Sequence, residues 1–233
     1  MTRDRSHCLS ESDSKGNRRK DKFAGRGREL TSYYERNIIA GMRYAAGHKQ
    51  HTSEKILRAA GRLFRKQGYA ATGVDAIMAS ANLTPGGFYS HFRSKEDLLA
   101  ETLDAVFREA GQDRPKPLNE LKGRAWLRAF VSFYLSSDHR DGPDRGCPMA
   151  ALAVEVARIG GKPRAVFEQH LRKVIDTVAQ QFDAESPERA RAIAVMALCL
   201  GGLTMARAAG PGNLSEEILQ VCRNAGLREI ERE

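Results

Sequence analysis

Residues 84–99 read TPGGFYSHFRSKEDLL, and the fold of the chain is best worked out from this stretch. It contains two adjacent glycines, Gly86 and Gly87. A glycine inside a helix costs about 1 kcal/mol relative to alanine, so a packed core helix gains nothing from the pair. Aromatic, hydroxyl and imidazole side chains follow directly. The pair therefore indicates that the backbone must come close to something at this point.

The sequence before this stretch predicts two helices. The first has one apolar stripe, formed by Ile56, Leu57, Ala60, Leu63 and Phe64. Gly68 follows two basic residues and should end that helix. Thr72, with Asp75 three residues later, predicts a side-chain cap on a short helix over 74–80, and a turn is expected at Asn82.

Two more helix starts lie within the quoted stretch. Thr84 is expected to cap a third helix with Pro85 in its first position, where a missing N–H costs nothing. Ser94 with Asp97 predicts the start of a fourth helix. A short helix, a three-residue turn and a second short helix, placed between amphipathic helices, make a helix-turn-helix layout. The second helix of such a motif enters the major groove of DNA.

This layout gives the quoted stretch a physical explanation. Without side-chain bulk at the glycine pair, the start of the third helix can approach a duplex until its N–H groups and dipole reach phosphate. Tyr89 and His91 are expected to point outward as donors to phosphate or base edges, whereas Phe88 and Phe92 face inward. Lys95 falls in the first turn of the fourth helix, where a cation is unfavourable for the dipole, which favours a partner outside the protein.

The segment over residues 52–99, TSEKILRAAGRLFRKQGYAATGVDAIMASANLTPGGFYSHFRSKEDLL, resembles the DNA-binding domain of tetracycline-repressor (TetR) family regulators. The resemblance covers about residues 50–110. It implies an all-helical, homodimeric repressor whose variable C-terminal domain binds an inducer and forms the dimer. By motif position it implies DNA contacts at Thr72, Thr84, Pro85, Gly86, Gly87, Tyr89, Ser90, His91 and Lys95. Pro85 replaces the basic or small polar residue of many relatives and Gly87 has no side chain, so base reading falls to Thr84, Ser90 and an N-terminal arm.

The segment before this domain is predicted to be a basic, largely disordered extension. Residues 1–50 carry twelve Lys and Arg against six Asp and Glu, so they hold most of the net charge of +9. The composition of the chain changes at Met42, which is a possible true start of translation. The arm after it supplies Arg43, His48 and Lys49, which would reach the DNA backbone or an adjacent minor groove. A leader that never touches DNA is an equally good interpretation.

The chain as a whole is predicted to be all-α, with about nine to ten helices. Its domains would be the extension over 1–49, the helix-turn-helix domain over 50–110, and a helical inducer-binding and dimerisation domain over 111–233. In the third domain, helices are predicted around Trp126 to Tyr134, over Ala150 to Ile159, after Pro163, after Pro187, and over Ile218 to Ile230 with Ser215 as cap.

The helices that start near Pro163 and Pro187 are expected to pair across a two-fold axis as a four-helix bundle. The second of them holds the apolar run from Ala192 to Met205, 14 residues long. A membrane span needs about 20 residues, so this run predicts a buried helix and no membrane partner. The N-terminus has no apolar stretch for secretion, and the protein is expected in the cytoplasm.

Cys147 allows two interpretations. It lies at a predicted helix start close to Arg145, and both features depress the pKa of a thiol, which favours a redox or electrophile sensor. A lone cysteine is more often a small buried hydrophobe. Trp126, Phe130 and Tyr134 would either line an inducer pocket or belong to the ordinary core, and their helical spacing favours the core.

Other function classes stay open. A helical enzyme would use Cys147 with His170 as nucleophile and base, without a third residue at informative spacing. An architectural DNA binder would show no sequence preference. The four cysteines form no CxxC pair, so neither a metal site nor a cofactor is predicted. The favoured function is not enzymatic: a ligand-responsive homodimeric repressor of double-stranded operator DNA, released by an unknown small-molecule inducer.

Overall fold

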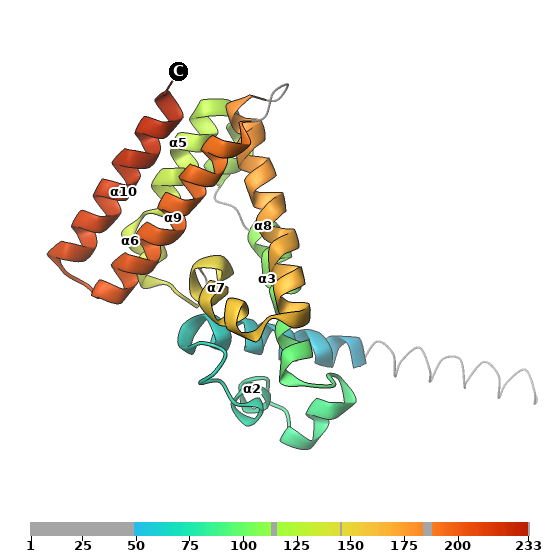
Figure 1. The fold of residues 1–233 in the computed structure, drawn as a ribbon. Helices are drawn as coiled ribbons and strands as arrows, with labels where there is room; N and C mark the ends of the chain where they lie inside the picture. Colours follow the sequence, from blue (N-terminus) through green and yellow to red (C-terminus); the bar gives the residue numbers. More distant parts are fainter. Residues whose placement is uncertain (1–48, 113–115, 145, 184–187, 233) are drawn as a thin grey trace, which may run out of the picture. The chain divides into compact units, whose positions relative to one another are not determined.

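The computed structural model describes residues 49–112, 116–144, 146–183 and 188–232, drawn as the coloured ribbon of Figure 1. Within these ranges every regular element is a helix, which confirms the predicted all-α class. His51–Glu233 forms one compact unit. Met42, Arg43 and His48 lie outside the described residues, together with nearly all of the predicted extension.

The helix-turn-helix part has the predicted order. Residues 49–67 are helical, and α2 (Val74–Ser80), the 3₁₀ helix η1 (Pro85–Ser90) and α3 (Lys95–Gln112) follow. Gly68 ends the first helix in the left-handed conformation, with φ +86°, and its N–H donates to the carbonyl oxygen of Phe64 at 3.0 Å. Asn82 has a φ of +57°, which makes the turn before η1.

The C-terminal half continues with helices only. They are α4 (Lys116–Glu120), α5 (Gly123–Tyr134), α6 (Ser137–Asp141), α7 (Pro148–Ile159), α8 (Gly161–Phe182), α9 (Arg189–Ala209) and α10 (Asn213–Glu231). The five long helices were predicted. The two short ones, α4 and α6, were not, because five residues are too few for an apolar period to appear.

Two apolar clusters form the core. In the helix-turn-helix part, Phe64, Ile77, Phe88 and Leu98 come from four successive helical elements and are fully buried. Residues of α7 belong to the same cluster, so α7 packs against the helix-turn-helix part. The other cluster is built by α5, α8, α9 and α10, which form the C-terminal half.

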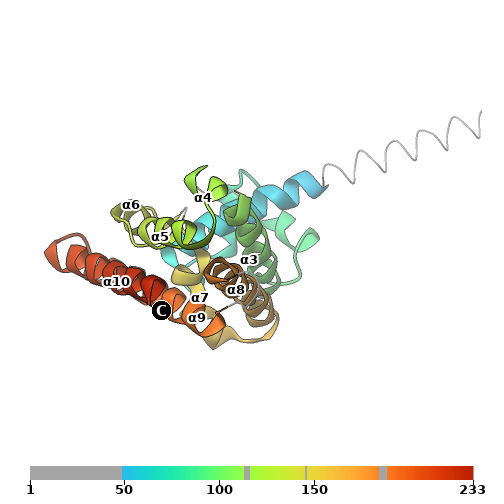
Figure 2. The same cartoon turned by 90° about the horizontal axis from the view of Figure 1, so that it is seen from above.

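Helix α9 lies between α8 and α10, as both Figure 1 and Figure 2 show, and its most extensive packing is with α10. By length and composition alone it would be able to cross a membrane. Its buried face nevertheless joins the protein core through Ala192, Val195, Cys199 and Leu203. The prediction of a buried helix is confirmed for this face, although the helix exceeds the 14-residue run that predicted it.

Three predicted side-chain caps do not form: Thr84 stands at the N-cap of η1 without a cap hydrogen bond, and two other hydroxyls are used elsewhere. Helix α2 has Gly73 at its N-cap, and the Thr72 hydroxyl instead donates to the carbonyl oxygen of Gly68 at 2.6 Å. Helix α10 has Gly212 at its N-cap, and Ser215 donates to an α9 carbonyl oxygen at 2.9 Å. Both hydroxyls are buried by neighbouring structure and are used there. The predicted Ser94 cap is confirmed, since its hydroxyl accepts from the N–H of Asp97 at 3.0 Å.

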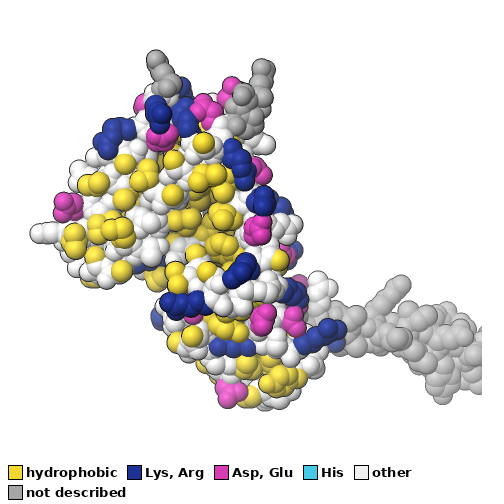
Figure 3. Space-filling model, in the orientation of Figure 1, with side chains coloured by type: hydrophobic (Ala, Val, Ile, Leu, Met, Phe, Trp, Pro, Cys, Tyr) yellow, Lys and Arg dark blue, Asp and Glu magenta, His cyan; other side chains and the backbone are white. Residues whose placement is uncertain are grey.

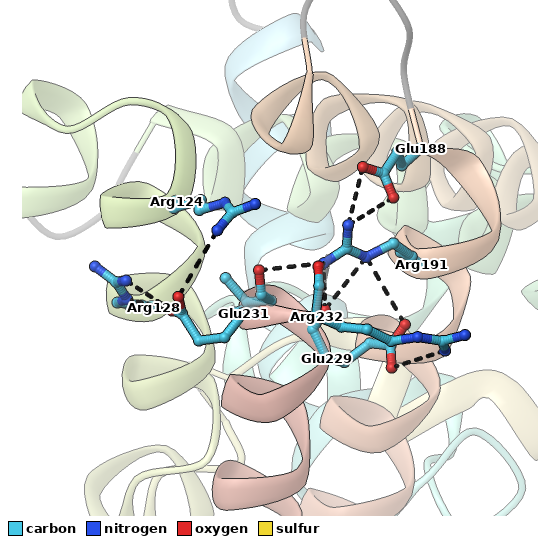
Figure 4. A network of polar contacts seen from close by, with 8 residues as sticks. Arg124, Arg128, Glu188, Arg191, Glu229, Glu231 and Arg232 are labelled. Atoms are coloured by element: carbon cyan, nitrogen blue, oxygen red, sulfur yellow. Dashed lines mark hydrogen bonds and ion pairs between the residues drawn. The ribbon is translucent and has the colours of Figure 1, made fainter.

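An arginine of α9 holds the C-terminal end of α10 (Figure 4). Arg191 donates to the main-chain oxygens of Glu229, Ile230 and Arg232 at 2.6, 3.2 and 2.6 Å, and it pairs with Glu188 at 2.7 Å. The last carbonyl groups of a helix have no partners within the helix, and a cation there also complements the helix dipole. This single side chain therefore fixes α10 to the start of α9.

Candidate nucleic-acid interface

The glycine pair has no structural requirement inside the protein. A Cβ added to Gly86 would meet nothing within 4 Å, and one added to Gly87 would meet only the Met78 methyl group at 3.6 Å, an ordinary contact. Neither glycine has a positive φ. Among the described residues, neither internal packing nor backbone conformation therefore requires glycine at these two positions.

The element that carries the pair differs from the one predicted. It is a six-residue 3₁₀ helix, and Thr84 stands at its N-cap without a side-chain hydrogen bond. Pro85 does occupy the first turn, as predicted. A helix this short has a small dipole, because few peptide units are aligned. The contribution of the dipole to phosphate binding is thus smaller than the sequence indicated, and close approach and side chains matter more.

The two phenylalanines and the tyrosine of this region lie as predicted, whereas the Nδ1 atom of His91 is buried. Phe88 and Phe92 are buried, with ring centroids 5.8 Å apart. The Tyr89 side chain is 74% exposed and meets the edge of Phe88 at 5.1 Å. His91 is partly exposed. The buried rings hold η1 to its support, and the tyrosine hydroxyl faces outward.

The other residues of the family motif lie around this tyrosine. Thr84, Pro85, Gly86 and Ser90 are exposed, and Gly87 and Lys95 are partly exposed. The Ser90 hydroxyl donates to the carbonyl oxygen of Gly87 at 2.7 Å. These residues form one surface strip along η1 and the start of α3.

Thr72 does not belong to that strip. It is fully buried, and its hydroxyl also accepts a hydrogen bond from the Gln67 amide at 3.2 Å. It has no exposed surface through which to contact a phosphate. The sequence placed it at a helix start, but its hydroxyl is held by the preceding helix. Of the predicted arm, Lys49 is exposed, and Arg43 and His48 lie outside the described residues.

Lys95 has a partner within the protein, contrary to the sequence argument. Its ammonium group lies 4.1 Å from the centroid of the Tyr69 ring, a cation–π contact. Burial lowers the pKa of Lys95. The contact therefore holds a lysine side chain that is still partly exposed.

A residue that the sequence analysis missed connects this region to α7. The Glu155 carboxylate accepts from the backbone N–H groups of Tyr69 and Ala70, at 2.8 and 2.9 Å. Its own helix gives no signal of this role, because the partners are more than 80 positions away in sequence. One carboxylate of α7 thus holds the loop whose tyrosine contacts Lys95.

The aromatic candidates of the C-terminal half belong to the core. Trp126 stacks on Phe130 with centroids 5.0 Å apart, and Phe130 lies 5.6 Å from Tyr134. Trp126 and Tyr134 are each only 4% exposed. Burial raises the pKa of Tyr134 well above its ordinary value. The three rings pack one after another along α5, as the core interpretation predicted.

Cys147 is half-buried at the N-cap of α7, and its backbone N–H donates to the Nε2 atom of His139 at 3.1 Å. His170 has other partners: its Nε2 lies 2.9 Å from Asp104 Oδ1, and its ring stacks on Phe107 at 4.5 Å. The partners found for Cys147 and His170 among the described residues differ, and the pair required for the cysteine-enzyme alternative does not form.

These features define a class: an all-helical protein with a helix-turn-helix whose second helix is exposed and free of internal constraints on its glycines. Residues 56–102 match the family profile described as bacterial regulatory proteins of the tetR family. The profile thus identifies the helix-turn-helix part as that of the TetR family of DNA-binding transcriptional regulators, which confirms the resemblance seen in the sequence.

Individual relatives share only a modest part of their sequence with this chain. The HTH-type transcriptional repressor NemR of Escherichia coli K12 is 25% identical over 139 residues, which cover 58% of this chain and 70% of NemR. The transcriptional regulator AcuR of Cereibacter sphaeroides is 30% identical over 117 residues, which cover 49% of this chain and 53% of AcuR.

Solved structures share the fold. The reduced form of E. coli NemR has a TM-score of 0.63 at 23% identity, over 75% of this chain and 96% of that one. A TetR transcriptional regulator from Chloroflexus aurantiacus has a TM-score of 0.66 at 24% identity, over 80% and 97% of the two chains.

Proposed function

We propose that the protein is a ligand-responsive homodimeric repressor that binds a pseudo-palindromic operator through η1. The space at the glycine pair carries this proposal: nothing in the described part of the chain requires Gly86 or Gly87, and Tyr89 beside them is 74% exposed. A duplex against η1 would explain both facts. The proposed contacts are Thr84, Pro85, Gly86, Gly87, Tyr89, Ser90, His91 and Lys95; Thr72 is omitted because it is buried.

The dimer contact is assigned to α9 and α10. The outward side of α9 carries small and apolar residues at helical spacing, namely Ile193, Ala197, Gly201, Met205 and Ala208. On α10, Leu214 and Val221 are 61% and 56% exposed. In Figure 3, hydrophobic side chains gather over α9 and α10. Two copies related by a two-fold axis would bury these residues against each other.

This assignment revises the predicted pairing of the helices near Pro163 and Pro187. Helix α8, which contains Pro163, exposes mainly charged side chains: Lys162, Arg164, Glu168, Arg172, Lys173 and Asp176. Its apolar side packs on α3 and α9 within the chain. A charged face contributes little to an obligate dimer interface, so α10 replaces α8 as the partner of α9.

Selection of bound fragments from a random DNA pool tests the proposal. The purified protein should enrich a pseudo-palindrome whose half-sites are about one helical turn, or a small multiple, apart. The preference should survive at moderate salt, where non-specific binding weakens. An architectural binder would retain DNA without enriching any sequence, and that result would contradict the proposal.

A thiol-responsive variant of the same function is kept as a second candidate. Cys147 caps α7, the helix that carries Glu155, so modification of its thiol would act on a helix bonded to the DNA-binding part. Replacement of Cys147 by serine would abolish release of the operator by an oxidant or electrophile. Unchanged release would rule this candidate out. In either form, the protein is expected to act in the cytoplasm, where its operator is.

A further inference from the structure

We propose that a basic cavity between the helix of residues 49–67, α7 and the end of α9 binds a small organic anion, and that this anion is the effector. The inference rests on the proposed ligand response and gives it a site and a ligand class. The cavity has a volume of about 460 Å³. Ligand pockets in proteins span roughly 300–1,000 Å³, so a metabolite-sized molecule fits and a macromolecule does not.

The charge of the wall selects an anion. Four cationic side chains line the cavity, Arg65, Lys66, Arg140 and Arg207, against one carboxylate, Asp141. Arg140 bonds both oxygens of that carboxylate, at 2.7 and 3.0 Å, and also pairs with Glu216 at 2.6 Å, so the uncompensated charge comes from Arg65, Lys66 and Arg207. The remaining wall is made of small residues, among them alanines of α7 and α9. The cavity therefore combines excess positive charge with room for an organic group.

Arg207 is the central observation. Its guanidinium donates only to main-chain oxygens, those of Arg140 at 3.2 Å and His139 at 2.6 Å, and forms no ion pair with a described residue. Burial lowers its pKa. A half-buried cation with carbonyl partners alone is stabilised by a charge-assisted hydrogen bond to an anion.

Arg65 repeats this arrangement on the opposite side. Its Nε donates to the carbonyl oxygen of Asp144 at 2.8 Å, and burial lowers its pKa. The carboxylates of Glu109 and Asp144 act on it from a distance, and neither forms an ion pair with it in the described part of the chain. Two guanidiniums from separate parts of the fold thus have spare capacity for the same anion.

The position of the cavity connects it to DNA binding. Arg65 belongs to the first helix of the DNA-binding part, and Arg207 to α9. Ala151 of α7 lines the cavity and lies one helical turn before Glu155, which holds the loop of Tyr69. An anion bridging the two arginines would stabilise one spacing of these elements over others. Such a difference between states is what lets a ligand shift a conformational equilibrium.

The test uses the full chain with defined probes in titration calorimetry. Benzoate and phenyl phosphate represent carboxylates and phosphate esters, and benzamide is a neutral control of the same shape as benzoate. At least one anion should bind, and benzamide should not. Arg207→Gln and the exposed-site variant Lys66→Gln should each weaken binding, the former by about tenfold or more because a charge-assisted bond is lost. The control Arg172→Gln on the exposed face of α8 should bind like the parent.

The outcomes separate this inference from the proposed function. The bound anion should weaken binding of a selected operator in the parent and leave it unchanged in Arg207→Gln. If neither anion binds better than benzamide, or if both cavity variants bind it like the parent, the cavity inference is wrong even where operator binding is normal. If no operator is selected, the proposed function fails, and calorimetry without DNA still decides whether the cavity takes an anion.

Discussion

Single residues around η1 show that contacts within the protein place few constraints on the surface of this helix. Gly86 and Gly87 are free of internal contacts that would exclude a side chain, and Tyr89 rests on Phe88 by one edge only. Phe88 and its buried neighbours hold the backbone, so the tyrosine needs little further ordering when it meets a partner. A surface with open space at its glycines is suited to close approach by a duplex.

Removal of single contacts should weaken operator binding. In Tyr89→Phe the phosphate loses a hydroxyl donor, and in Lys95→Ala it loses a cation. Each change should lower affinity by about fivefold or more, and the lysine variant should also reduce the slope of affinity against salt by about one. Fluorescence anisotropy with the selected operator measures both effects.

Lys173→Ala, on the exposed charged face of α8, is the matched control and should bind like the parent. Because Lys95 also contacts the Tyr69 ring, urea unfolding of the variant must accompany the binding measurement. Parental operator affinity in both variants would show that the contact assignment is wrong, even though the family is right.

Helix α7 is linked directly to the DNA-binding part, because the carboxylate of its Glu155 accepts hydrogen bonds from two backbone N–H groups of the loop before α2. Helix α7 also carries Cys147 at its cap and part of the cavity wall. A change at either place would act on a helix that is hydrogen-bonded to the DNA-binding part. The bond between Glu155 and the loop is therefore the expected route of regulation.

Replacement of Glu155 by glutamine should loosen the loop, because a neutral amide has one acceptor oxygen where the carboxylate has two. We expect the free energy of unfolding to fall by about 1–3 kcal/mol, the range for hydrogen bonds to a charged group. Urea unfolding measures this. Glu168→Gln on the exposed face of α8 is the control and should change little. Equal effects of the two substitutions would contradict the role assigned to Glu155.

Arg191→Ala should destabilise the C-terminal half. The variant leaves the carbonyl groups at the end of α10 without their donor and removes the stacking of the guanidinium on the Phe182 ring, 4.6 Å away. The expected loss is about 2–4 kcal/mol in urea unfolding, as for other broken buried networks. Arg128→Ala removes an exposed ion pair to Glu231 and should have little effect. A smaller loss in Arg191→Ala than in Arg128→Ala would contradict this account.

Periodicity in the sequence predicted the long helices because each has an apolar face that repeats along the chain. The bounds of α2 and the turn at Asn82 followed from local rules, and the structure confirms them. The caps assigned to Thr72 and Ser215 failed because their hydroxyls are bonded to parts of the fold that local rules ignore. The hydrogen bonds of Glu155 and the contact of Lys95 with Tyr69 join positions that are far apart in sequence. They can therefore be seen only in the folded chain.

On the scale of the whole molecule, the exposed apolar side of α9 and α10 is the feature that bears on the oligomeric state. A monomer would leave Ile193, Met205, Leu214 and Val221 in water, and exposed apolar patches of this kind mark interaction sites. In the proposed function the occupant would be a second copy, since a pseudo-palindromic operator would need two recognition helices at a fixed spacing.

Ala197→Glu tests this interface. The residue is exposed within one chain, so the fold should be kept, but two copies would bring the buried carboxylates together across the two-fold axis. The variant should be a monomer in sedimentation equilibrium at concentrations where the parent is a dimer, and it should lose operator binding. Gln180→Glu on α8 should remain a dimer. A dimeric Ala197→Glu protein with parental operator affinity would show that the interface lies elsewhere.

The claim on which the rest depends is that the glycine pair exists for the approach of DNA, and Gly86→Ala measures it most directly. The added methyl group meets nothing within 4 Å inside the protein, so the free energy of unfolding should stay the same or rise by about 0.4–1 kcal/mol. Affinity for the selected operator should nevertheless fall by about tenfold or more, as one lost backbone contact to phosphate and one new clash would cause. A variant that is as stable as the parent and binds the operator equally well would contradict the account.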